Sequence, residues 1–389
     1  MATGQRTTYT DTTTQKRSVA DLITMIEWTE APLLNLLGVN NESRFRLVNW
    51  PRTKFEWLED TMSPRSTTLA ANISSAGATT FTVASDTGQY FKNGDVLEIN
   101  NELVWVESVS GDTITVASTG GRGFGGTTAT THSSGDTVEL ATIARLEGAV
   151  ATTGHTTTVS APYNYTQILA EAVQVTGSQE IDSNYGYNDE MARQIAKLIG
   201  GPTEIGSKGK AGKLAILLQQ GFYKGRRSQG TATTARSFGG FEQFVTTNLS
   251  NVASAALTRK HIEDLFESCF LAGGMPDTLV CNSWVRRKIT SFYEGAIHTD
   301  RSETRGGSSI THIVTDFGDI EIVHDRWCPQ SKAYLIEKDK MGWVTYRPFS
   351  IYDRASTGDY ELKDVLGEYS FALMNEESHG LLYNISTTK

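Results

Sequence analysis

Residues 258–295 read TRKHIEDLFESCFLAGGMPDTLVCNSWVRRKITSFYEG. Thr258 is a residue type that favours a helix N-cap, and Gly273 with Gly274 favours a helix end, so a helix is predicted between them. Its apolar residues recur at helical spacing and form one buried face: Ile262, Leu265, Phe266, Cys269 and Phe270.

A short strand and a second helix follow with little chain between them. The apolar run 279–281 predicts a strand, which we expect at the edge of a sheet. Asn282 and Ser283 supply the cap of the second helix, which is expected to end at Gly295. Its inner face would be Val285, Ile289 and Phe292.

A β-hairpin is predicted next, after a polar, Gly-rich loop. Strands are expected at 310–314 and 320–323, and Asp316-Phe317-Gly318-Asp319 has the composition of the turn between them. The hairpin is followed by three further sequence features: Asp325-Arg326-Trp327-Cys328-Pro329, then Trp343, then Arg347-Pro348.

The N-terminal region has a different composition. Residues 1–17 are rich in Thr, Gln and Arg and carry too little apolar surface to order alone, which predicts an arm that orders against a neighbouring molecule. Residues 18–37 are amphipathic and predict a helix broken at Pro32. The sequence FEWLED at 55–60 then begins an extended segment.

The middle of the chain predicts one long strand and an interrupted helix. The strand covers 165–175, and the helix after it is expected to be capped at Asn188. Gly200-Gly201-Pro202 interrupts this helix, because Pro lacks a backbone donor, and a second helical piece is expected at 213–222. The inner face of the first piece would be Met191, Ile195, Leu198 and Ile199.

Residues 66–142 are dominated by Thr, Ser and Gly, and their apolar residues alternate. Strands are predicted at 81–83, 96–99, 104–106, 114–116 and 138–140, enough for a small β-barrel or sandwich. The module contains the pattern Gly94-Asp95-Val96, Trp105-Val106, Arg122-Gly123, Thr128-Ala129, His132 and Gly135-Asp136. This pattern resembles that of modules inserted in phage structural proteins.

The order of all these elements resembles the major capsid proteins of tailed bacteriophages, which have the Hong-Kong-type capsid fold. No single motif carries the resemblance, which lies in the collinear order of the elements. It implies an α+β fold with an N-terminal arm (1–50), an extended loop (51–164) carrying an inserted all-β domain (66–142), a peripheral domain with the spine helix (165–240 and 335–389) and an axial domain (241–334).

Composition limits the classes of protein. With 389 residues, two or three packed units are expected, and the formal net charge of −9 argues against a protein that neutralises phosphate over a broad surface. The three cysteines, Cys269, Cys281 and Cys328, are interpreted as small buried residues in a reducing cytoplasm. The Thr-rich start of the sequence predicts no signal peptide, and no run of apolar residues is long enough to predict a membrane-spanning helix.

Motifs that suggest catalysis or cofactor binding are better explained as turns. Residues 121–126 match G-x-G-x-x-G, but the Thr-rich segment after them has no helical face to receive a phosphate. Asp316-Phe317-Gly318 matches a kinase triplet without the other kinase motifs. The seven histidines lack metal-site spacing. No enzyme activity, cofactor or metal is therefore predicted.

Contacts between subunits are the expected functional sites. An arginine beside a tryptophan can stack and pair with a carboxylate, which suits a subunit junction. The candidate residues are Trp57, Asp60, Arg326, Trp327 and Arg347. We also expect that only neighbouring subunits cover the apolar side chains Trp50, Phe55, Trp57 and Leu58. The basic pairs and triplets at 226–227 and 286–288 are interpreted as charge-paired surface, with contact to DNA or scaffold as the alternative.

The resemblance implies a structural function. The chain would assemble with itself as hexamers and pentamers into an icosahedral head, in the host cytoplasm and then in the virion. Its other partners would be a separate scaffolding protein, a portal protein, packaged double-stranded DNA held non-specifically on the inner face, and a decoration protein as a further candidate, with no membrane. A β-rich tail or adhesin protein and a nucleic-acid-binding module are the alternatives.

Overall fold

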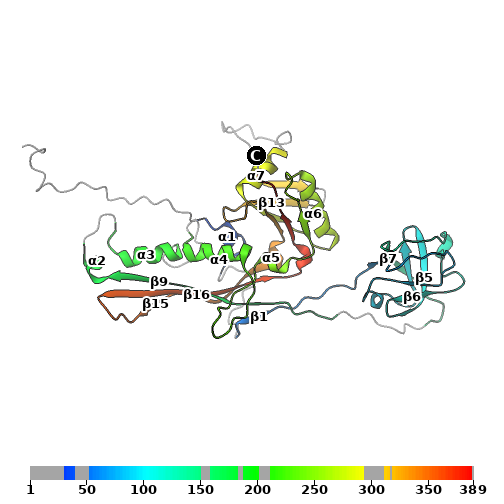
Figure 1. Ribbon diagram of the computed structural model, residues 1–389, viewed down its shortest axis with the longest axis horizontal. Coiled ribbons are helices and arrows are strands. Elements are labelled where there is room, and N and C mark those ends of the chain that lie inside the picture. Colours follow the sequence, from blue (N-terminus) through cyan, green and yellow to red (C-terminus); the bar gives the residue numbers. More distant parts are fainter. Residues whose placement is uncertain are drawn as a thin grey trace, which may run out of the picture. The chain divides into compact units, whose positions relative to one another are not determined.

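The computed structural model describes residues 30–39, 52–149, 158–182, 187–200, 211–292, 311–315 and 318–387 (Figure 1). The chain forms two compact units. Unit 1 comprises residues 1–57 and 162–389, and unit 2 comprises residues 58–161. Helices and sheets occur together in unit 1, so the predicted α+β class is confirmed.

A six-stranded mixed sheet organises one half of unit 1. Its order is β10 (Leu249–Asn251), β17 (Gly380–Tyr383), β14 (Ala333–Ile336), β11 (Thr278–Cys281), β13 (Gly318–His324) and β12 (His312–Thr315). The strand predicted at a sheet edge, β11, lies instead between β14 and β13. That expectation was wrong because all four residues of β11 are buried on both faces, which local sequence did not reveal. The pairing of Thr315 with Gly318 confirms the predicted hairpin.

Two helices cover one face of this sheet: α6 (Arg259–Leu271) and α7 (Ser283–Phe292). Thr258 caps α6 as predicted, in a capping box with His261. The predicted inner faces of both helices are buried except at two positions: Phe292 of α7 is only partly buried, and Phe270 of α6 is exposed. Phe270 is 43% exposed, because the sheet covers a narrower stripe of α6 than the apolar periodicity suggested.

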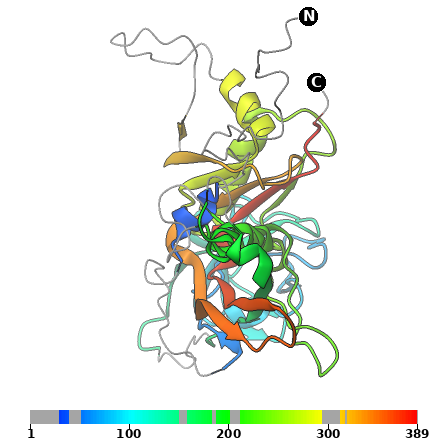
Figure 2. The same ribbon diagram turned by 90° about the vertical axis from the view of Figure 1, so that its left-hand side faces the viewer.

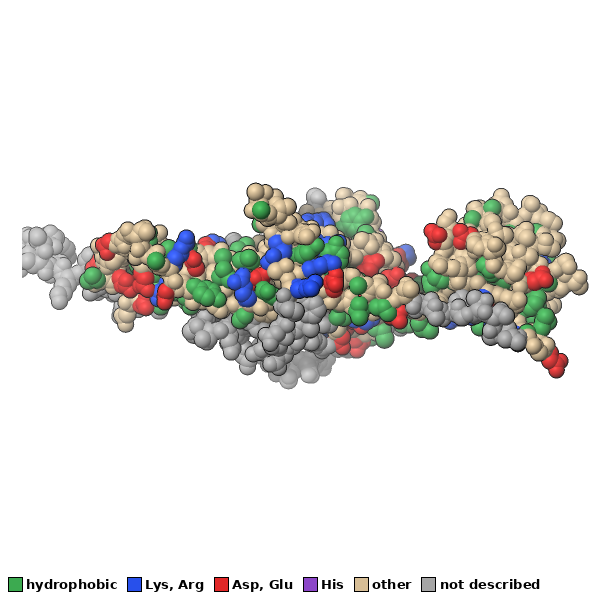
Figure 3. All heavy atoms as spheres, turned by 90° about the horizontal axis from the view of Figure 1, so that it is seen from below, with side chains coloured by type: hydrophobic (Ala, Val, Ile, Leu, Met, Phe, Trp, Pro, Cys, Tyr) green, Lys and Arg blue, Asp and Glu red, His purple; other side chains and the backbone are tan. Residues whose placement is uncertain are grey.

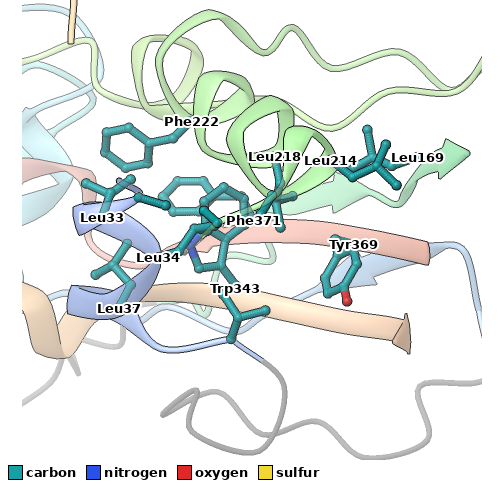
Figure 4. Close-up of a cluster of buried hydrophobic side chains, with 14 of the residues drawn as sticks. Leu33, Leu34, Leu37, Leu169, Leu214, Leu218, Phe222, Trp343, Tyr369 and Phe371 are labelled. Atoms are coloured by element: carbon teal, nitrogen blue, oxygen red, sulfur yellow. The ribbon is translucent and has the colours of Figure 1, made fainter. Parts of the chain in front are cut away.

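The opposite face of the sheet packs on the largest core of the described residues (Figure 4). Val280 of β11 and Tyr334 of β14 point to this core, whereas their neighbours along each strand point to α6 and α7: Leu279 and Cys281 on β11, Ala333 and Leu335 on β14. Four further helices contribute to it: α1 (Pro32–Leu37), α3 (Glu190–Ile199), α4 (Lys213–Lys224) and α5 (Phe241–Phe244). Aromatic rings in mutual contact dominate its centre: Phe222, Tyr223, Phe241, Tyr334, Trp343 and Phe371.

A three-stranded antiparallel sheet forms the rest of unit 1. Its order is β15 (Met341–Arg354), β16 (Tyr360–Leu373) and β9 (Gln167–Thr176). The helices α3 (Glu190–Ile199) and α4 lie along one face of it (Figure 2). A short helix, α2 (Gly177–Ile181), follows β9 and was not predicted.

The predicted interruption of the long helix is confirmed. Gly200 adopts a left-handed conformation (φ 94°) that ends α3, and α4 begins thirteen residues later at Lys213. The expected cap at Asn188 was wrong by one position. Asp189 is the N-cap, because its carboxylate accepts a hydrogen bond of 2.8 Å from the Ala192 backbone N–H.

The segment that leads out of unit 1 is a two-stranded ladder of β1 (Lys54–Glu56) and β8 (Tyr163–Tyr165). Phe55 and Trp57 are only 2% and 4% exposed. Val344, Ala372 and other residues of their own chain cover them, so the expectation that only neighbouring subunits cover these two side chains was wrong. Trp50 lies outside the described residues, as does nearly all of the predicted 18–37 helix except α1.

Unit 2 is a small closed barrel with its own core. The antiparallel order is β2 (Ser66–Thr68), β7 (Thr137–Ile143), β4 (Asp95–Ile99), β5 (Glu102–Ser110), β6 (Thr113–Val116) and β3 (Thr80–Thr82). A bridge between Leu69 and Val83 joins the two end strands. All five predicted strands are present, and the period-two alternation predicted them because each strand has one face in the barrel core.

Short 3₁₀ turns complete the described secondary structure: η2 (Gly88–Tyr90), η3 (Phe124–Gly126), η4 (Lys338–Lys340) and η5 (Glu376–Ser378). The G-x-G-x-x-G match at 121–126 falls on η3 and is a loop, as predicted. Within the described ranges, helices are too short or too polar to cross a membrane.

Candidate interaction surfaces and buried ion pairs

The five candidate contact residues do not form one site. Asp60 belongs to unit 2 and is exposed, and Arg326 is exposed in unit 1. Trp57 is buried in its own chain. Trp327 donates its indole N–H to the Glu30 carbonyl at 2.9 Å, so it attaches the segment before α1 to the body of unit 1.

Arg347, the fifth candidate, belongs to a buried ion-pair cluster. Its guanidinium contacts the Glu368 carboxylate at 2.8 Å, and Arg236 contacts the same carboxylate at 2.5 Å. Thr166 also donates its hydroxyl to Glu368, at 2.6 Å. Glu368 is 2% exposed, whereas the side chains of Arg236 and Arg347 are 24% and 43% exposed. The cluster therefore joins β15, β16, the residue between β8 and β9, and the segment between α4 and α5, while its cations reach solvent.

Asp325 is a second buried carboxylate, and the hydrogen bonds that the structure gives it come from neutral groups. Gln219 donates to it at 2.5 Å, Tyr223 donates its hydroxyl, and the Trp327 backbone N–H donates at 2.9 Å. Burial raises the pKa of Asp325, and these three hydrogen bonds oppose the rise only in part. The cluster connects α4 to the segment after β13 and so fixes the position of Trp327.

Glu102 is the third buried carboxylate and lies in unit 2. Arg122 pairs with it through two hydrogen bonds of 2.6 and 2.9 Å, and His132 contacts it at 2.9 Å. The backbone N–H groups of Gly123 and Thr130 complete its shell. Burial by itself would raise the pKa of Glu102, but the hydrogen bonds from Arg122, Thr130 and His132 outweigh it and lower the pKa to about 2.

Sequence reasoning did not assign Glu102 a role, although it quoted most of its partners. Arg122-Gly123 and His132 belong to the pattern that suggested a phage insertion module. The structure explains the pattern: an arginine, a tight glycine turn and a histidine converge on one carboxylate. The glycine is required because Gly123 has φ 61° and a Cβ there would lie 2.6 Å from the Thr127 carbonyl oxygen.

Basic side chains surround Tyr163 at the base of the β1–β8 ladder. The Lys54 ammonium lies 4.1 Å and the Arg227 guanidinium 4.0 Å from the centre of its ring. Arg226 lies 4.0 Å from Glu242. Arg226 thus has a carboxylate of its own chain nearby, as the charge-paired interpretation expects, whereas Arg227 contacts an aromatic ring and donates to the Tyr163 carbonyl at 2.7 Å. Figure 3 shows Lys and Arg side chains over the middle of unit 1 and acidic side chains towards the far end of the β15–β16 hairpin.

Large apolar side chains remain exposed on both units. In unit 2 they flank the barrel in the sequence: Leu58, Met62, Ile143, Leu146 and Val159. In unit 1 they include Ile168, Ile181, Leu271, Met275 and Val314.

Sites for metal or thiol chemistry do not emerge from the described part of the chain. No group of three or more His, Cys, Asp or Glu there has the geometry of a metal site. All three cysteines are free and buried, as predicted, and burial raises the pKa of Cys269 and of Cys281 to about 12.

This architecture is that of a phage capsid protein with the Hong-Kong-type fold. The chain is similar to a subunit of the cyanophage A-1(L) capsid asymmetric unit, with a TM-score of 0.56 and 13% sequence identity over 98% of this chain and 100% of that one. It is also similar to the capsid of a native GTA particle, with a TM-score of 0.51 and 10% identity over 97% of each chain.

The model of the SU10 major capsid protein family matches residues 6–386, so the chain belongs to this family. It is a major capsid protein of a tailed bacteriophage and a structural component of the virion head. No curated protein matches it. The match spans both units, which a tail or adhesin protein sharing only the β-rich segment would not explain.

Proposed function

We propose that this chain closes into hexamers and pentamers that together build the icosahedral head around the genome. The observation that carries the proposal is the family match over residues 6–386. The function is mechanical: the chain holds a shell together and carries out no reaction. The exposed apolar residues of both units would supply part of the surface that neighbouring copies bury.

Of the five candidate contact residues, three keep the exposure that a contact with a neighbouring subunit requires. Asp60 and Arg326 are exposed, and the side chain of Arg347 is 43% exposed while it pairs with Glu368. Trp57 and Trp327 would act indirectly, because they fix the β1–β8 ladder and the segment before α1 within their own chain.

The other proposed partners follow from the class of protein. Assembly would take place in the host cytoplasm with a separate scaffolding protein and a portal, and the finished shell would enclose double-stranded DNA. The net charge of −9 fits an inner wall that does not hold the polymer tightly. A decoration protein is a further proposed partner.

The domain arrangement is proposed on the same basis. Residues 66–142 would be an inserted domain on the extended loop 51–164, because the barrel has a core of its own. Deletion of residues 67–142 with a short linker should leave unit 1 folded, measured by circular dichroism and limited proteolysis. Global unfolding of that variant would contradict an inserted domain.

Electron microscopy of the purified recombinant chain tests the main proposal. We expect closed shells or capsomers, in the presence of scaffold if the chain alone does not close. Sedimentation velocity provides the quantitative measurement, since capsomers and shells sediment far faster than a 42.5 kDa chain. A strictly monomeric species at high concentration under both conditions would contradict self-assembly.

A further inference from the structure

The β1–β8 ladder is too small to be stable by itself. It pairs three residues on each strand, and within the described residues no further strand joins it. An isolated two-stranded ladder is at most marginally stable in water, so other contacts must hold it on the body of unit 1. Phe55 and Trp57 supply one set of contacts through their burial. A second set comes from residues 226–240, which we call the strap.

The strap is attached to the body of unit 1. Phe238 is 1% exposed, and its ring centre lies 5.9 Å from that of Trp343 in the largest core of the described residues. A Cβ on Gly221 of α4 would clash with the Phe238 ring, so the close approach of strap and helix requires glycine there. The Arg227 backbone N–H donates to the Gln243 side-chain carbonyl of α5 at 2.7 Å. The strap is thus fixed to α4, α5 and the core.

Two arginines of the strap bind the chain at β8. The Arg227 guanidinium lies 4.0 Å from the centre of the Tyr163 ring and donates to the Tyr163 carbonyl at 2.7 Å. Arg236 donates to the Thr166 carbonyl at 2.7 Å. Hydrogen bonds from a charged donor are stronger than those between neutral groups. The strap therefore holds the first residue of β8 and the residue that follows the strand.

A backbone bridge within the strap sets the spacing of these two arginines. Ser228 and Ser237 exchange backbone hydrogen bonds of 3.0 and 3.1 Å and close the strap into a hairpin. Arg227 and Arg236 each precede one residue of this pair. Because side chains alternate along extended chain, both arginines point to the same side of the hairpin, the side that contacts β8.

Between the two arginines, the side chain of Asn164 joins the strap to β8. The Gly239 N–H donates to the Asn164 Oδ1 at 2.8 Å, and the Gly239 carbonyl accepts from the Asn164 Nδ2 at 2.9 Å. The same Nδ2 donates to the Phe371 carbonyl of β16 at 2.7 Å. Asn164 is 0% exposed. The strap thus contacts three of the four residues 163–166.

We infer that the strap fixes the direction in which the β1–β8 ladder leaves the body of unit 1. The consequence for assembly rests on the proposed function and domain arrangement, in which the ladder is the base of the extended loop 51–164. A loop held at its base in one direction presents the same surface in every copy. A closed shell built from repeated subunits needs such uniform contacts.

Hydrogen exchange of the full-length chain tests the inference in the subunit. Arg227→Ala removes both the ring contact and the hydrogen bond at Tyr163. Peptides that cover 52–60 and 158–166 should exchange about tenfold faster in this variant, because a ladder released from the strap opens more often. Peptides from α4 and from the six-stranded sheet should keep the exchange rates of the parent chain.

Arg226→Ala is the matched control, since it removes the same side chain from the preceding residue. Arg226 is 68% exposed, and its carboxylate neighbour is Glu242 of α5 and not a residue of the ladder. The ladder peptides of this variant should exchange within about twofold of the parent. Arg227→Lys is the second variant if Arg227→Ala does not fold. It keeps the charge but not the planar guanidinium, and the same peptides should exchange faster by a smaller factor.

Electron microscopy tests the consequence for assembly. Particles of Arg227→Ala should include several times the fraction of irregular or open shells that Arg226→Ala gives, because the extended loops no longer leave every subunit in the same direction. Equal fractions in the two variants, with the ladder loosened in Arg227→Ala, would overturn a role of the strap in assembly.

The results of hydrogen exchange separate the hypotheses. Unchanged exchange of the ladder in the Arg227 variants, or equal acceleration in Arg226→Ala, would overturn the inference. Faster exchange throughout unit 1 would also overturn it, because Arg227 would then stabilise the core and not the ladder alone. Each of these results leaves the proposed capsid function standing. Failure of the unsubstituted chain to form any particle would instead count against that function, while hydrogen exchange of the subunit would still test the strap.

Discussion

Glu102 in unit 2 and Asp325 in unit 1 are exposed by 1% and 0%, yet they differ in the charge of their partners. Arg122 neutralises Glu102 directly, and the pKa of that carboxyl falls to about 2. Asp325 receives hydrogen bonds from the neutral groups of Gln219, Tyr223 and the backbone, and burial raises its pKa. Burial alone therefore does not decide the charge state of a carboxylate in this chain.

The Glu102 and Asp325 clusters also differ in the segments of the chain that they connect. In unit 2, a barrel of about a hundred residues, the Arg122 side chain also donates to the Ser75, Ala78 and Thr130 carbonyls and so connects several loops through one ion pair. In unit 1, Asp325 sits beside an extensive aromatic core that already supplies packing. We expect the small unit to depend on its charged cluster more than the large unit depends on Asp325.

The largest effect should come from Glu102→Ala. It leaves the Arg122 guanidinium, only 7% exposed, without its partner, and removal of one member of a buried pair costs about 3–5 kcal/mol. Hydrogen exchange of the full-length chain should show peptides from 58–161 losing protection while those from unit 1 keep it. The matched control is Glu98→Ala on the exposed face of β4, expected within about 0.5 kcal/mol of the parent. Equal effects of the two variants would refute the role of the cluster.

Acid should weaken unit 2 through the same carboxylate. In the folded chain the pKa of Glu102 is about 2, below its ordinary value of 4.5. The stability that the ionised carboxylate contributes is therefore fully present above pH 4.5 and is lost as the pH falls towards 2. The full loss is on the order of 3 kcal/mol.

Trp105 is the single tryptophan of residues 58–161, so 5-fluorotryptophan NMR of its resonance during urea unfolding measures this dependence. Glu102→Gln lacks the titrating carboxyl, so the free energy of unfolding of unit 2 should change less between pH 4.5 and 2.5 in this variant than in the parent chain. A profile as steep as that of the parent chain would assign the acid sensitivity to other groups.

Glu368→Gln sharpens the comparison, since Glu368 is as buried as Glu102 and also pairs with arginine. Arg236 and Arg347 are 24% and 43% exposed, so water can solvate them when the carboxylate is neutralised. We expect a loss of about 1–2 kcal/mol, smaller than for Glu102→Gln. Urea unfolding followed at Trp343 in unit 1 provides the measurement. If Glu368→Gln lowered the free energy of unfolding as much as Glu102→Gln does, the exposure of the arginines would not determine how much stability is lost when the carboxylate is neutralised.

Asp325→Asn should have the smallest effect on stability, and the pH dependence that it removes is opposite in sign to that of Glu102. The folded pKa of Asp325 is raised above the ordinary 3.8, so its contribution is greatest below that pH and declines as the pH rises through the folded pKa. Because Asn does not titrate, the variant should remove this contribution to the change of unfolding free energy with pH. It should also lower the free energy of unfolding by about 1 kcal/mol, because the amide group of Asn does not accept the same hydrogen bonds as the Asp325 carboxyl. The measurement is the free energy of unfolding, followed at Trp343, as a function of pH. If it changes with pH equally in the variant and the parent chain, ionisation of Asp325 does not contribute to the pH dependence of unit 1.

Local sequence determined the individual elements. The helices α6 and α7, the strands of unit 2 and the break after α3 were predicted because apolar periodicity, an N-cap at Thr258 and a left-handed Gly200 act over a few neighbouring residues. The order of these elements along the chain was enough to indicate the capsid fold, since that order is itself a property of the sequence.

Tertiary structure alone decided which surfaces are covered. That β11 lies inside its sheet depends on β13 and β14, which follow it by several dozen residues. That Trp57 is buried depends on Val344 and Ala372, more than a hundred residues away, and that Phe270 is exposed depends on the width of a sheet. The same holds for the Glu368 cluster, in which Thr166 and Arg236 meet a carboxylate 202 and 132 residues along the chain. The local sequence gives the type and spacing of apolar and charged residues. Which residue each of them contacts depends on how distant segments pack together, and no local pattern contains that information.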